Sequence, residues 1–461
     1  MSTAHLLRKL AGALSSQPAD ADDPISLRGK RLLVVFGSYR SKRHIYEHAR
    51  SLGVELVVID GPDHWVRECA GTGDLIERHL AVSLSPFSTF PERAVAAARQ
   101  SGLAFDGIGT IDEFAGGFGA RIAADLRLPF HSTEAADRAR DKHRARESCA
   151  AAGLPGPRFA RIESASAIEH AAESVGFPAV LKPVSGVGSV QTYRVDNVED
   201  LTRRHDEITT EVQKIRARPR GALASDRDWF DLMWSGVPHL TLESWVEGPK
   251  YDVDLLLDSG RVLYAHATDD LHPVGLRDVR RVAPSGLSAS AEAELIDHAA
   301  ACVRAIGFRR GAFNVEVKRT AFGPRMIEVN GRLGGYSTTD IHREVWGVDL
   351  VEAWLRLSLG SPAEIREKPH GRWVAESLLP APRTGTVARD GFLEHLKHEP
   401  ALLVARQWVF AGDLVAGLET GAPDWMGALL THGETREKAL FELDRLHSQV
   451  DLPVISGPKE A

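Results

Sequence analysis

Four polar side chains with the chemistry of a magnesium and phosphate site lie on two neighbouring segments of the chain. Glu316 belongs to the first segment, and Glu328, Asn330 and Arg332 belong to the second. Both segments alternate apolar with polar residues, which predicts two β-strands joined by a short loop. If the strands pair antiparallel, two carboxylates and an amide oxygen meet as ligands for Mg²⁺, and Arg332 can bind an anion with two hydrogen bonds. The alternative is the solvated outer face of an ordinary hairpin.

A loop rich in small residues is a second candidate for contact with phosphate. Lys182 lies on a predicted strand, and the loop that follows contains Ser185, Gly186, Gly188 and Ser189. Backbone N–H groups of such a loop can close around phosphate oxygens, and the lysine adds positive charge. The lysine precedes the glycines, so the pattern is not that of a Walker loop. A purely structural hairpin is an equally good interpretation of this loop taken alone.

A third candidate is a predicted strand that breaks at a Gly-Pro pair. The break predicts unpaired backbone groups from Ser244 to Val246, where a purine edge could form hydrogen bonds. An ordinary edge strand explains the same pattern equally well.

Basic side chains gather in and beside a loop further along the chain. These are His266, His272, Arg277, Arg280 and Arg281. They could hold substrate carboxylates, although each one alone is more typical of a solvated loop residue.

The elements around these motifs predict an α/β protein. The apolar run Arg31–Gly37 is typical of a buried parallel strand, and a helical stretch then leads to a second strand that ends at Asp60. This order also suits a dinucleotide-binding domain of a dehydrogenase, but only Gly37 stands where that fingerprint needs three glycines. Beyond Pro369, short strands alternate with turns, which predicts a mixed α/β lobe.

Length and composition exclude several classes of protein. A chain of 461 residues is too long for one ordinary core and favours about three units. The net charge of -7 argues against a nucleic-acid binder, and no apolar run approaches the roughly 18 residues that would span a bilayer. The 3 cysteines lie far apart, which suits a reducing compartment, so we expect a cytoplasmic protein without a membrane partner.

Taken in order, these features resemble the ATP-grasp superfamily, and within it the carboxylate–amine ligases that join amino acids. The resemblance rests on Asp141 and Lys142, on the strand lysine with its Gly/Ser loop, on the segment Glu243–Gly248, and on the hairpin with its carboxylates. It extends over about residues 30 to 450. The implied fold combines an N-terminal open α/β domain, a two-subdomain α+β ATP-grasp fold and a C-terminal mixed α/β lobe.

The resemblance also implies domain boundaries. They are a flexible segment at 1–28, an α/β domain at 29–131, a central ATP-grasp subdomain at 132–247, a C-terminal ATP-grasp subdomain with the metal site at 248–362, and the last lobe at 363–461. A homodimer is the habit of the family.

The resemblance assigns a role to each motif. Contacts with ATP fall to Lys142, Lys182, Ser185, Gly186, Gly188, Ser189, Glu243, Trp245, Val246 and Lys250. One or two Mg²⁺, for which Mn²⁺ can substitute, fall to Glu316, Glu328 and Asn330, and Arg332 acts as the catalytic cation. Substrate contacts fall to His266, His272, Arg332, Gly334, Gly335 and Tyr336. The family commonly has an acidic residue near Lys250 that holds the ribose, and Asp252 and Asp254 are the alternatives here.

The implied activity joins two small substrates, at least one of them an amino acid, through an amide or peptide bond. The γ-phosphoryl group of ATP converts a carboxylate into an acyl phosphate, the amine attacks it, and ADP and phosphate are released. Alternatives within the fold are a ligase for a non-amino-acid carboxylate of the nucleotide-biosynthesis type and a kinase that phosphorylates a hydroxyl group. A nucleotide-binding module without catalysis is the alternative from another class.

Overall fold

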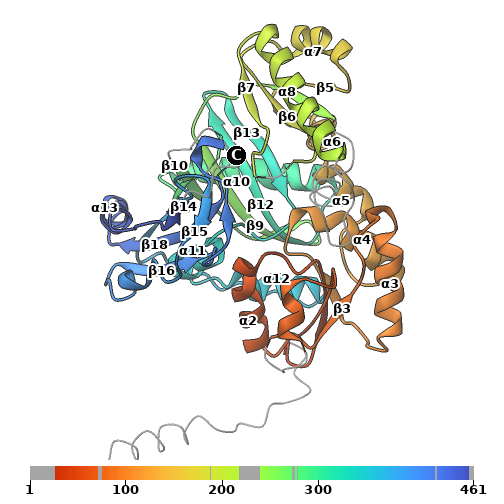
Figure 1. Ribbon diagram of the computed structural model, residues 1–461, viewed down its shortest axis with the longest axis vertical. Coiled ribbons are helices and arrows are strands. Elements are labelled where there is room, and N and C mark those ends of the chain that lie inside the picture. The colour runs from red at the N-terminus through yellow and green to blue at the C-terminus, as the bar shows by residue number, and fades with distance from the viewer. Residues whose placement is uncertain are drawn as a thin grey trace, which may run out of the picture.

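The computed structural model describes the chain from residue 26 to residue 455 apart from short gaps. The described ranges are 26–70, 75–186, 188–217, 239–271, 276–277, 279–420 and 423–455. None of the helices in these ranges has the length and apolar character needed to cross a membrane. Figure 1 shows the course of the chain, with the N-terminal layer at the bottom and right and the C-terminal lobe at the left.

A parallel α/β layer opens the described chain. Its sheet has the order β3-β2-β1-β4. The strands are β1 (Arg31–Val35), β2 (Glu55–Asp60), β3 (Arg78–Ala81) and β4 (Gly107–Gly109), and the helices are α2 (Arg43–Ser51), α3 (Phe90–Gln100) and α4 (Gly116–Leu126). The strands β1, β2 and β4 are largely apolar runs because helices and the rest of the protein cover both faces of the sheet, whereas β3 at the edge is partly exposed.

A small antiparallel sheet follows two connecting helices. The helices are α5 (Thr133–Arg140) and α6 (Lys142–Ala151). The sheet has the order β5-β8-β6-β7, with β5 (Phe159–Ile162), β6 (Ala179–Pro183), β7 (Tyr193–Val195) and β8 (Leu240–Ser244). One face is buried under α7 (Ile168–Val175) and α8 (Val198–Ala217), which leaves the other face to the rest of the protein. This unit lies at the top of Figure 1, above the largest sheet.

The largest sheet has eight strands in the order β13-β12-β9-β10-β11-β14-β18-β16. Its first part consists of β9 (Lys250–Asp258), β10 (Arg261–Leu271), β11 (Arg280–Ala283), β12 (Gly311–Thr320) and β13 (Gly323–Asn330). Its second part consists of β14 (Trp373–Pro380), β16 (Leu402–Gln407) and β18 (Trp425–Gly433). The C-terminal segment is thus mixed α/β as expected, but its long strands continue this sheet. The predicted boundary at residue 362 stays a prediction.

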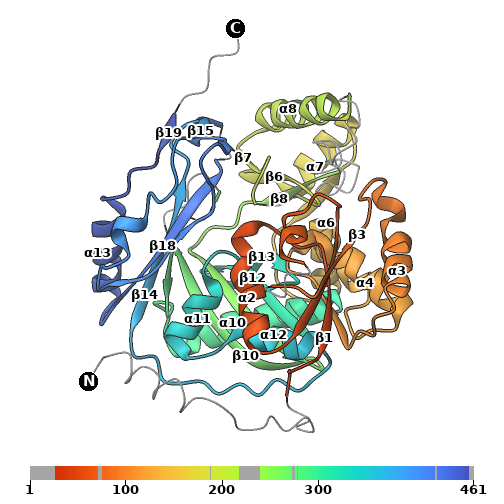
Figure 2. The same ribbon diagram turned by 60° about the horizontal axis from the view of Figure 1, so that its bottom comes forward.

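The remaining elements cover the large sheet and extend its C-terminal part. The helices are α10 (Ala289–Ile306), α11 (Thr338–Trp346), α12 (Leu350–Ser358) and α13 (Arg436–His447). The strands β15 (Gly385–Val387), β17 (Leu414–Val415) and β19 (Val454–Ile455) form a separate three-stranded sheet. Figure 2 shows α11 and α12 beside the N-terminal layer, and α13 against β14 and β18.

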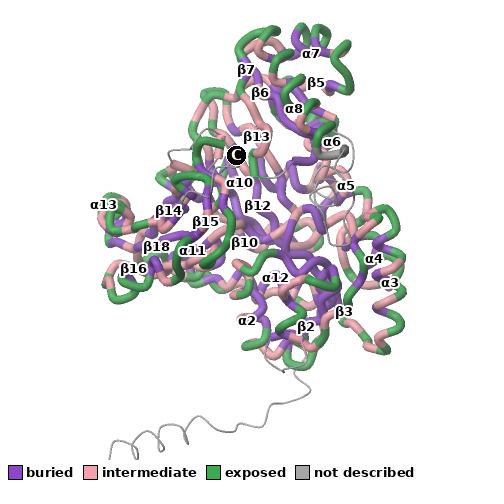
Figure 3. Tube along the Cα trace, viewed as in Figure 1, coloured by how far each residue is buried: buried purple, intermediate pink, exposed green. Residues whose placement is uncertain are grey.

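The two faces of β9 and β12 differ in chemistry, as alternation along a strand requires. Apolar side chains of odd number, such as Val253 and Val315, pack in the cluster formed with α10. Even-numbered side chains on the opposite face include Asp252, Asp254 and Glu316, which are polar. Figure 3 shows that the strands of this region run through the buried interior. Polar groups placed there are costly to bury without partners, so this face is where a functional site is expected.

The N-terminal layer packs directly against α12. A Cβ atom added at Gly107 would overlap the backbone carbonyl of Ser358 at the end of α12. A Cβ atom added at Gly109 would lie 2.7 Å from the ring of Trp354. The absence of side chains at these two glycines therefore permits close contact between β4 and α12.

We predict that Gly107→Ala destabilises the protein by about 3 kcal/mol, because the new methyl group forces backbone apart at this contact. Thermal or urea unfolding measures the effect. Gly156→Ala is the matched control, since a Cβ atom there meets no heavy atom within 4 Å. Equal stability of the two variants would contradict the packing described between β4 and α12.

Candidate active site

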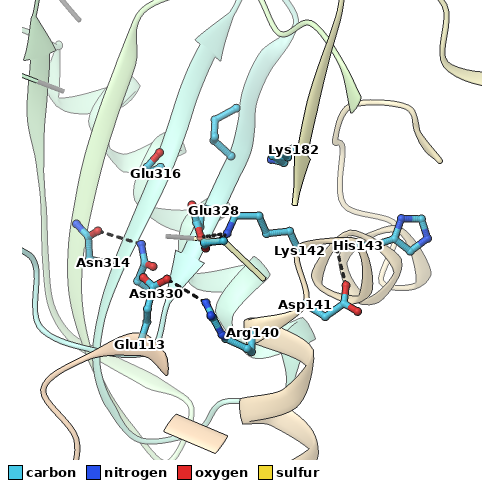
Figure 4. Close-up of polar contacts among 12 residues, drawn as sticks. Glu113, Arg140, Asp141, Lys142, His143, Lys182, Asn314, Glu316, Glu328 and Asn330 are labelled. Atoms are coloured by element: carbon cyan, nitrogen blue, oxygen red, sulfur yellow. Dashed lines mark hydrogen bonds and ion pairs between the residues drawn. The ribbon is translucent and has the colours of Figure 1, made fainter. Parts of the chain in front are cut away.

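Two carboxylates face each other across the β12 and β13 pair. Glu316 stands opposite Glu328 in the antiparallel register, and Asn314 stands opposite Asn330. Both carboxylates line one cavity between the small sheet and the large sheet. Figure 4 shows Glu316 and Glu328 on neighbouring strands, with Asn330 further along the strand of Glu328. The structure thus brings the two carboxylates together in one cavity, with Asn330 two residues beyond Glu328 at the end of β13, and the role of all three as ligands stays a prediction.

Each carboxylate of this pair has a lysine partner. The Nζ of Lys142 lies 2.8 Å from Oε1 of Glu328, and the Nζ of Lys250 lies 2.9 Å from Oε2 of Glu316. Lys250 also lies 3.1 Å from Oδ2 of Asp270. Burial acts to raise the pKa of Glu328, but Lys142 and other cations outweigh it and lower that pKa. Glu328 is therefore ionised at neutral pH.

The donor set fits a hard divalent cation that also binds phosphate. Among the residues that the structure describes, no group of three or more His, Cys, Asp or Glu side chains is arranged to hold a metal ion. Two carboxylates, of Glu316 and Glu328, and the neutral amide oxygen of Asn330 make up this donor set. A protein site for calcium usually supplies more oxygen ligands and more negative charge. Mg²⁺ characteristically binds one or two carboxylates and completes its shell with phosphate oxygens and water.

The Gly/Ser loop lies over the same cavity. Lys142 donates a hydrogen bond of 2.7 Å to the carbonyl of Gly186, so this lysine joins the loop to Glu328. Gly188 and Ser189 have left-handed backbones, with φ of 58° and 55°, and both line the cavity. Ser185 is 3% exposed and does not line the cavity, so its assignment to phosphate has the least support in the loop.

A buried cluster of three charges closes the inner end of the cavity. Oε2 of Glu243 lies 2.9 Å from Nζ of Lys182 and 2.8 Å from Nη2 of Arg146. Burial acts to raise the pKa of Glu243, but Arg146 and Lys182 outweigh it and bring that pKa from 4.5 to about 2. Oε1 of Glu243 is buried without a hydrogen-bond partner among the described residues. It is thus an acceptor without a donor in the described part of the chain, on a side chain that lines the cavity.

Arg146 was not among the sequence candidates. It projects from α6 and donates to the carbonyls of Met326 and Ile327 on β13, at 2.5 and 2.7 Å, as well as to Glu243. Its three contacts therefore fix α6, β8 and β13 relative to one another. No local pattern marks this residue, since its partners lie far away in the sequence.

The prediction of unpaired backbone groups after β8 is wrong for two N–H groups. Ser244 donates to the carbonyl of Arg158 at 2.8 Å, and Trp245 donates to the carbonyl of Pro178 at 2.9 Å. The chain here is the continuation of a sheet, so its N–H groups find partners on neighbouring strands. Trp245 and Val246 do line the cavity, and the carbonyl of Val246 accepts a hydrogen bond of 3.0 Å from Lys318.

Arg332 contacts Glu113, one of the residues that line a second, smaller cavity beside Glu328. Its Nη2 lies 3.4 Å from Oε2 of Glu113, and Nη1 of Arg140 lies 3.4 Å from Oε1 of Glu113. Glu113, Arg140, Glu328 and Asn330 line this cavity. Sequence reasoning missed Glu113 and Arg140. The signal for Glu113 was its position after a buried parallel strand, β4, where the carboxyl ends of strands commonly carry functional groups.

The residues expected to contact substrate are only partly brought together. The ring of His266 stacks on Trp346 at 4.2 Å, and its nitrogens face Glu292 and Glu367 at 3.4 and 3.0 Å. His266 does not line either cavity. No contact of its side chain with the described residues therefore supports its predicted role in substrate binding. His272 lies outside the described residues.

The loop after Arg332 is held by a buried ion pair between Arg281 and Glu376. Arg281 also donates to the carbonyl of Gly335 at 3.3 Å, and Glu376 accepts from the backbone N–H of Ser337 at 3.0 Å. Tyr336 lies between these anchors.

Aromatic contacts surround Tyr336. Its ring stacks on Trp408 at 5.8 Å and meets Trp425 edge-on at 6.4 Å. At the preceding glycines, a Cβ atom on Gly334 would overlap Asp254, whereas one on Gly335 would meet open space. These contacts give the segment one conformation, and its contact with substrate stays a prediction.

The side chains of Asp252 and Asp254, the two alternatives for binding the ribose hydroxyls, are buried and have other partners. Asp252 is 6% exposed and lies 3.6 Å from Arg281, and Asp254 is 2% exposed and bonded to Asn314 and His342. Both side chains lie below the cavity floor, in the buried polar face of the sheet. Lys250 does line the cavity, but its contacts with Glu316 and Asp270 place its ammonium near the carboxylate pair.

Comparison with known proteins agrees with this geometry. Models of the ATP-grasp domain and of the ATP-grasp N-terminal domain match residues 175–340 and 46–130. Carnosine synthase 1 of Homo sapiens is 28% identical over 360 residues, which are 75% of this chain and 42% of that protein. A D-alanine–D-alanine ligase of Ectopseudomonas mendocina is 30% identical over 200 residues, which are 42% of this chain and 55% of that protein.

A solved structure extends the likeness to nearly the whole chain. The L-amino acid ligase from Bacillus licheniformis superposes with a TM-score of 0.77 at 20% identity, over 94% of this chain and all of that chain. The chain therefore belongs to the ATP-grasp superfamily, and the expected fold class is confirmed. It spans less than half the length of the human relative.

The charge cluster at Glu243 predicts a pH-dependent stability. Glu243→Gln leaves Arg146 and Lys182 buried without a counter-charge, and we expect it to cost about 3 kcal/mol at pH 7. The folded-state pKa of Glu243 lies below its ordinary value, so its stabilising effect is present above 4.5 and is lost as the pH falls towards about 2. Unfolding at pH 7 and pH 3 measures the difference between variant and wild type.

The difference in the free energy of unfolding between wild type and Glu243→Gln should therefore be smaller at pH 3 than at pH 7. Glu163→Gln, at an exposed site just after β5, is the control and should show no difference at either pH. A difference for Glu243→Gln that stays the same at pH 3 would contradict the charge assignment.

Proposed function

We propose that the protein is an ATP-dependent ligase that joins a carboxylate to an amine, with at least one amino acid among its substrates. The observation that carries the proposal is the meeting of Glu316 and Glu328, each with its lysine, at the rim of a cavity roofed by the Gly/Ser loop. Relatives named as carnosine synthase, D-alanine–D-alanine ligase and L-amino acid ligase support the amino-acid substrate.

In this proposal ATP lies in the larger cavity with its base at the inner end. The unpartnered Oε1 of Glu243 accepts a hydrogen bond from the exocyclic amino group of adenine, and Val246 lines the same end. Lys182 and Lys142 face the phosphates, and the backbone of Gly186, Gly188 and Ser189 covers them. We assign no residue to the ribose hydroxyls.

Glu316, Glu328 and Asn330 would hold Mg²⁺, with Mn²⁺ as a substitute. The metal supplies positive charge to the phosphoryl group that is transferred. Lys142 pairs with Glu328 and Lys250 pairs with Glu316, at 2.8 and 2.9 Å. Both lysines can turn towards phosphate oxygens when the carboxylates take another cationic partner, so the charge of the site stays balanced.

The reaction needs charge neutralisation more than it needs a covalent nucleophile. A carboxylate oxygen of the first substrate attacks the γ-phosphorus of ATP, ADP leaves, and an acyl phosphate results. The amine of the second substrate then attacks the acyl carbon, and phosphate leaves with the carboxylate oxygen. We assign the stabilisation of the negative charge of this step to Arg332, which pairs with Glu113 at 3.4 Å. Closure of the Gly/Ser loop excludes water that would hydrolyse the acyl phosphate.

We place the charged groups of the second substrate near Glu113, Arg140 and Arg332. These side chains offer a carboxylate for an ammonium group and guanidinium groups for a carboxylate, which are the two charges of an amino acid. We propose that Gly334, Gly335 and Tyr336 limit the size of this substrate. A cytoplasmic location and a homodimer complete the proposal.

Isotope transfer tests the reaction directly. With ATP, Mg²⁺ and amino-acid pairs that include an ¹⁸O-labelled carboxylate, we expect ADP and phosphate only when both substrates are present, with ¹⁸O in the phosphate. Mass analysis of phosphate and of the amide product measures both. Glu328→Gln should lower the rate by about a hundredfold or more, because one metal ligand and one charge are lost. Glu199→Gln, far from the cavity on exposed α8, is the control.

Other products would overturn the proposal. AMP with pyrophosphate would show adenylation in place of phosphorylation. Phosphate transfer to a hydroxyl group without an amide product would identify a kinase.

A further inference from the structure

A line of buried hydrogen bonds runs from Asn330 across the large sheet. Nδ2 of Asn330 lies 3.4 Å from Oδ1 of Asn314, and Nδ2 of Asn314 lies 3.1 Å from Oδ1 of Asp254. Oδ2 of Asp254 lies 3.2 Å from Nε2 of His342, whose Nδ1 lies 2.7 Å from the hydroxyl of Tyr264. Figure 4 shows the first of these contacts, between Asn314 and Asn330.

The strand register and burial make this line a fixed part of the fold. Asn330 pairs with Asn314 between β13 and β12, and Asn314 pairs with Asp254 between β12 and β9. The side chains of Asn330, Asn314 and Asp254 are 4%, 5% and 2% exposed. Water does not readily replace these contacts, so each polar atom depends on its neighbour in the line.

The carboxylate of Asp254 determines which way the side-chain amides of Asn314 and Asn330 are oriented. An ionised carboxylate only accepts hydrogen bonds, so Asn314 must turn its NH₂ group towards Asp254. Its carbonyl oxygen then faces Asn330, which must in turn present its own NH₂ group to Asn314. The remaining atom, Oδ1 of Asn330, is therefore directed away from Asn314. Asn330 and Glu328 both line the smaller cavity, so Asn330 lies beside a carboxylate that is assigned to the metal ion.

The far end of the line is compatible with the same direction. His342 is 0% exposed and Tyr264 is 2% exposed. Burial raises the pKa of Tyr264, so its hydroxyl group keeps a proton that it can donate to Nδ1 of His342. With Tyr264 as the donor, the imidazole carries its proton on Nε2 and donates to Asp254. A single tautomer thus satisfies both contacts, and the second oxygen of Asp254 has a donor.

We propose that Asp254 and Asn314 are positioning residues that present Oδ1 of Asn330 to the metal ion beside Glu328. The inference rests on the proposed function, because that function assigns a metal ion to Glu316, Glu328 and Asn330. It goes further by assigning a task to two residues that do not line either cavity. Without a fixed acceptor at position 254, the two amides could reverse and present an NH₂ group to the cation.

Metal affinity, measured apart from activity, tests the proposal. We titrate the protein with Mn²⁺ in the presence of a non-hydrolysable ATP analogue and follow bound Mn²⁺ by electron paramagnetic resonance. Asp254→Asn removes the carboxylate with little change of shape, and we expect the Kd for Mn²⁺ to rise about tenfold. Thermal unfolding of each variant reports the fold separately.

A double variant provides the rescue. In Asp254→Asn with Asn314→Asp, the carboxylate at position 314 accepts from both neighbouring amides, and the amide oxygen at position 254 still accepts from His342. Asn330 then keeps its original direction, so we expect the Kd to return to within about threefold of wild type. Measurement of the double variant still tests the proposal if Asp254→Asn alone unfolds. Tyr264→Phe, at the far end, is the control for general disturbance and should change the Kd less than twofold.

Two outcomes would overturn the inference. A folded Asp254→Asn protein with unchanged Kd would show that the direction of the line does not matter. A folded double variant that binds Mn²⁺ as weakly as the single variant would show a merely structural role. Glu328→Gln separates the inference from the proposed function, because normal Mn²⁺ affinity in that variant would remove the metal site itself.

Discussion

The approach of two carboxylates across one strand pair is the constraint around which the site is built. Like charges about 4 Å apart near a protein surface repel each other by about 4 kcal/mol, so Glu316 and Glu328 need cations beside them. Lys142 comes from α6 and Lys250 from β9, so elements on both sides of the cavity supply the charge. The two lysines thus allow the fold to hold a pair of acidic side chains close together.

The remaining architecture holds this pair in place from several directions. Arg146 ties α6 to β13 behind Glu328, and Glu113 brings the N-terminal layer to Arg332. The C-terminal lobe contributes Glu376, which pairs with Arg281 and holds the loop after Arg332. Each part of the chain therefore supplies at least one charged group near the cavities.

The sequence was informative where local pattern determines geometry. Alternation along two strands and a short connection fix both register and face, which is why Glu316 and Glu328 could be predicted to meet. The Gly/Ser loop and Lys182 were likewise visible as neighbours in sequence. The continuation of the large sheet into β14 and β18 was not visible, because pairing between distant strands leaves no local mark.

The missed and mistaken assignments share one cause, which is a partner far away in the chain. Arg146 and Glu113 act through contacts with Met326 and Arg332, and nothing near them in sequence indicates these partners. The N–H group of Trp245 seemed free only because its acceptor, Pro178, lies on another segment. His266 has the chemistry of a substrate ligand, but stacking on Trp346 and two acidic neighbours engage it elsewhere.

The position of a metal ion is the most direct measure of this account. Crystals grown with Mn²⁺ and a non-hydrolysable ATP analogue would locate the ion by its anomalous scattering. The account predicts a peak between Glu316 and Glu328, about 2.1 Å from an oxygen of each and next to the terminal phosphate. A nucleotide bound in the cavity with its metal ion away from both carboxylates would contradict it.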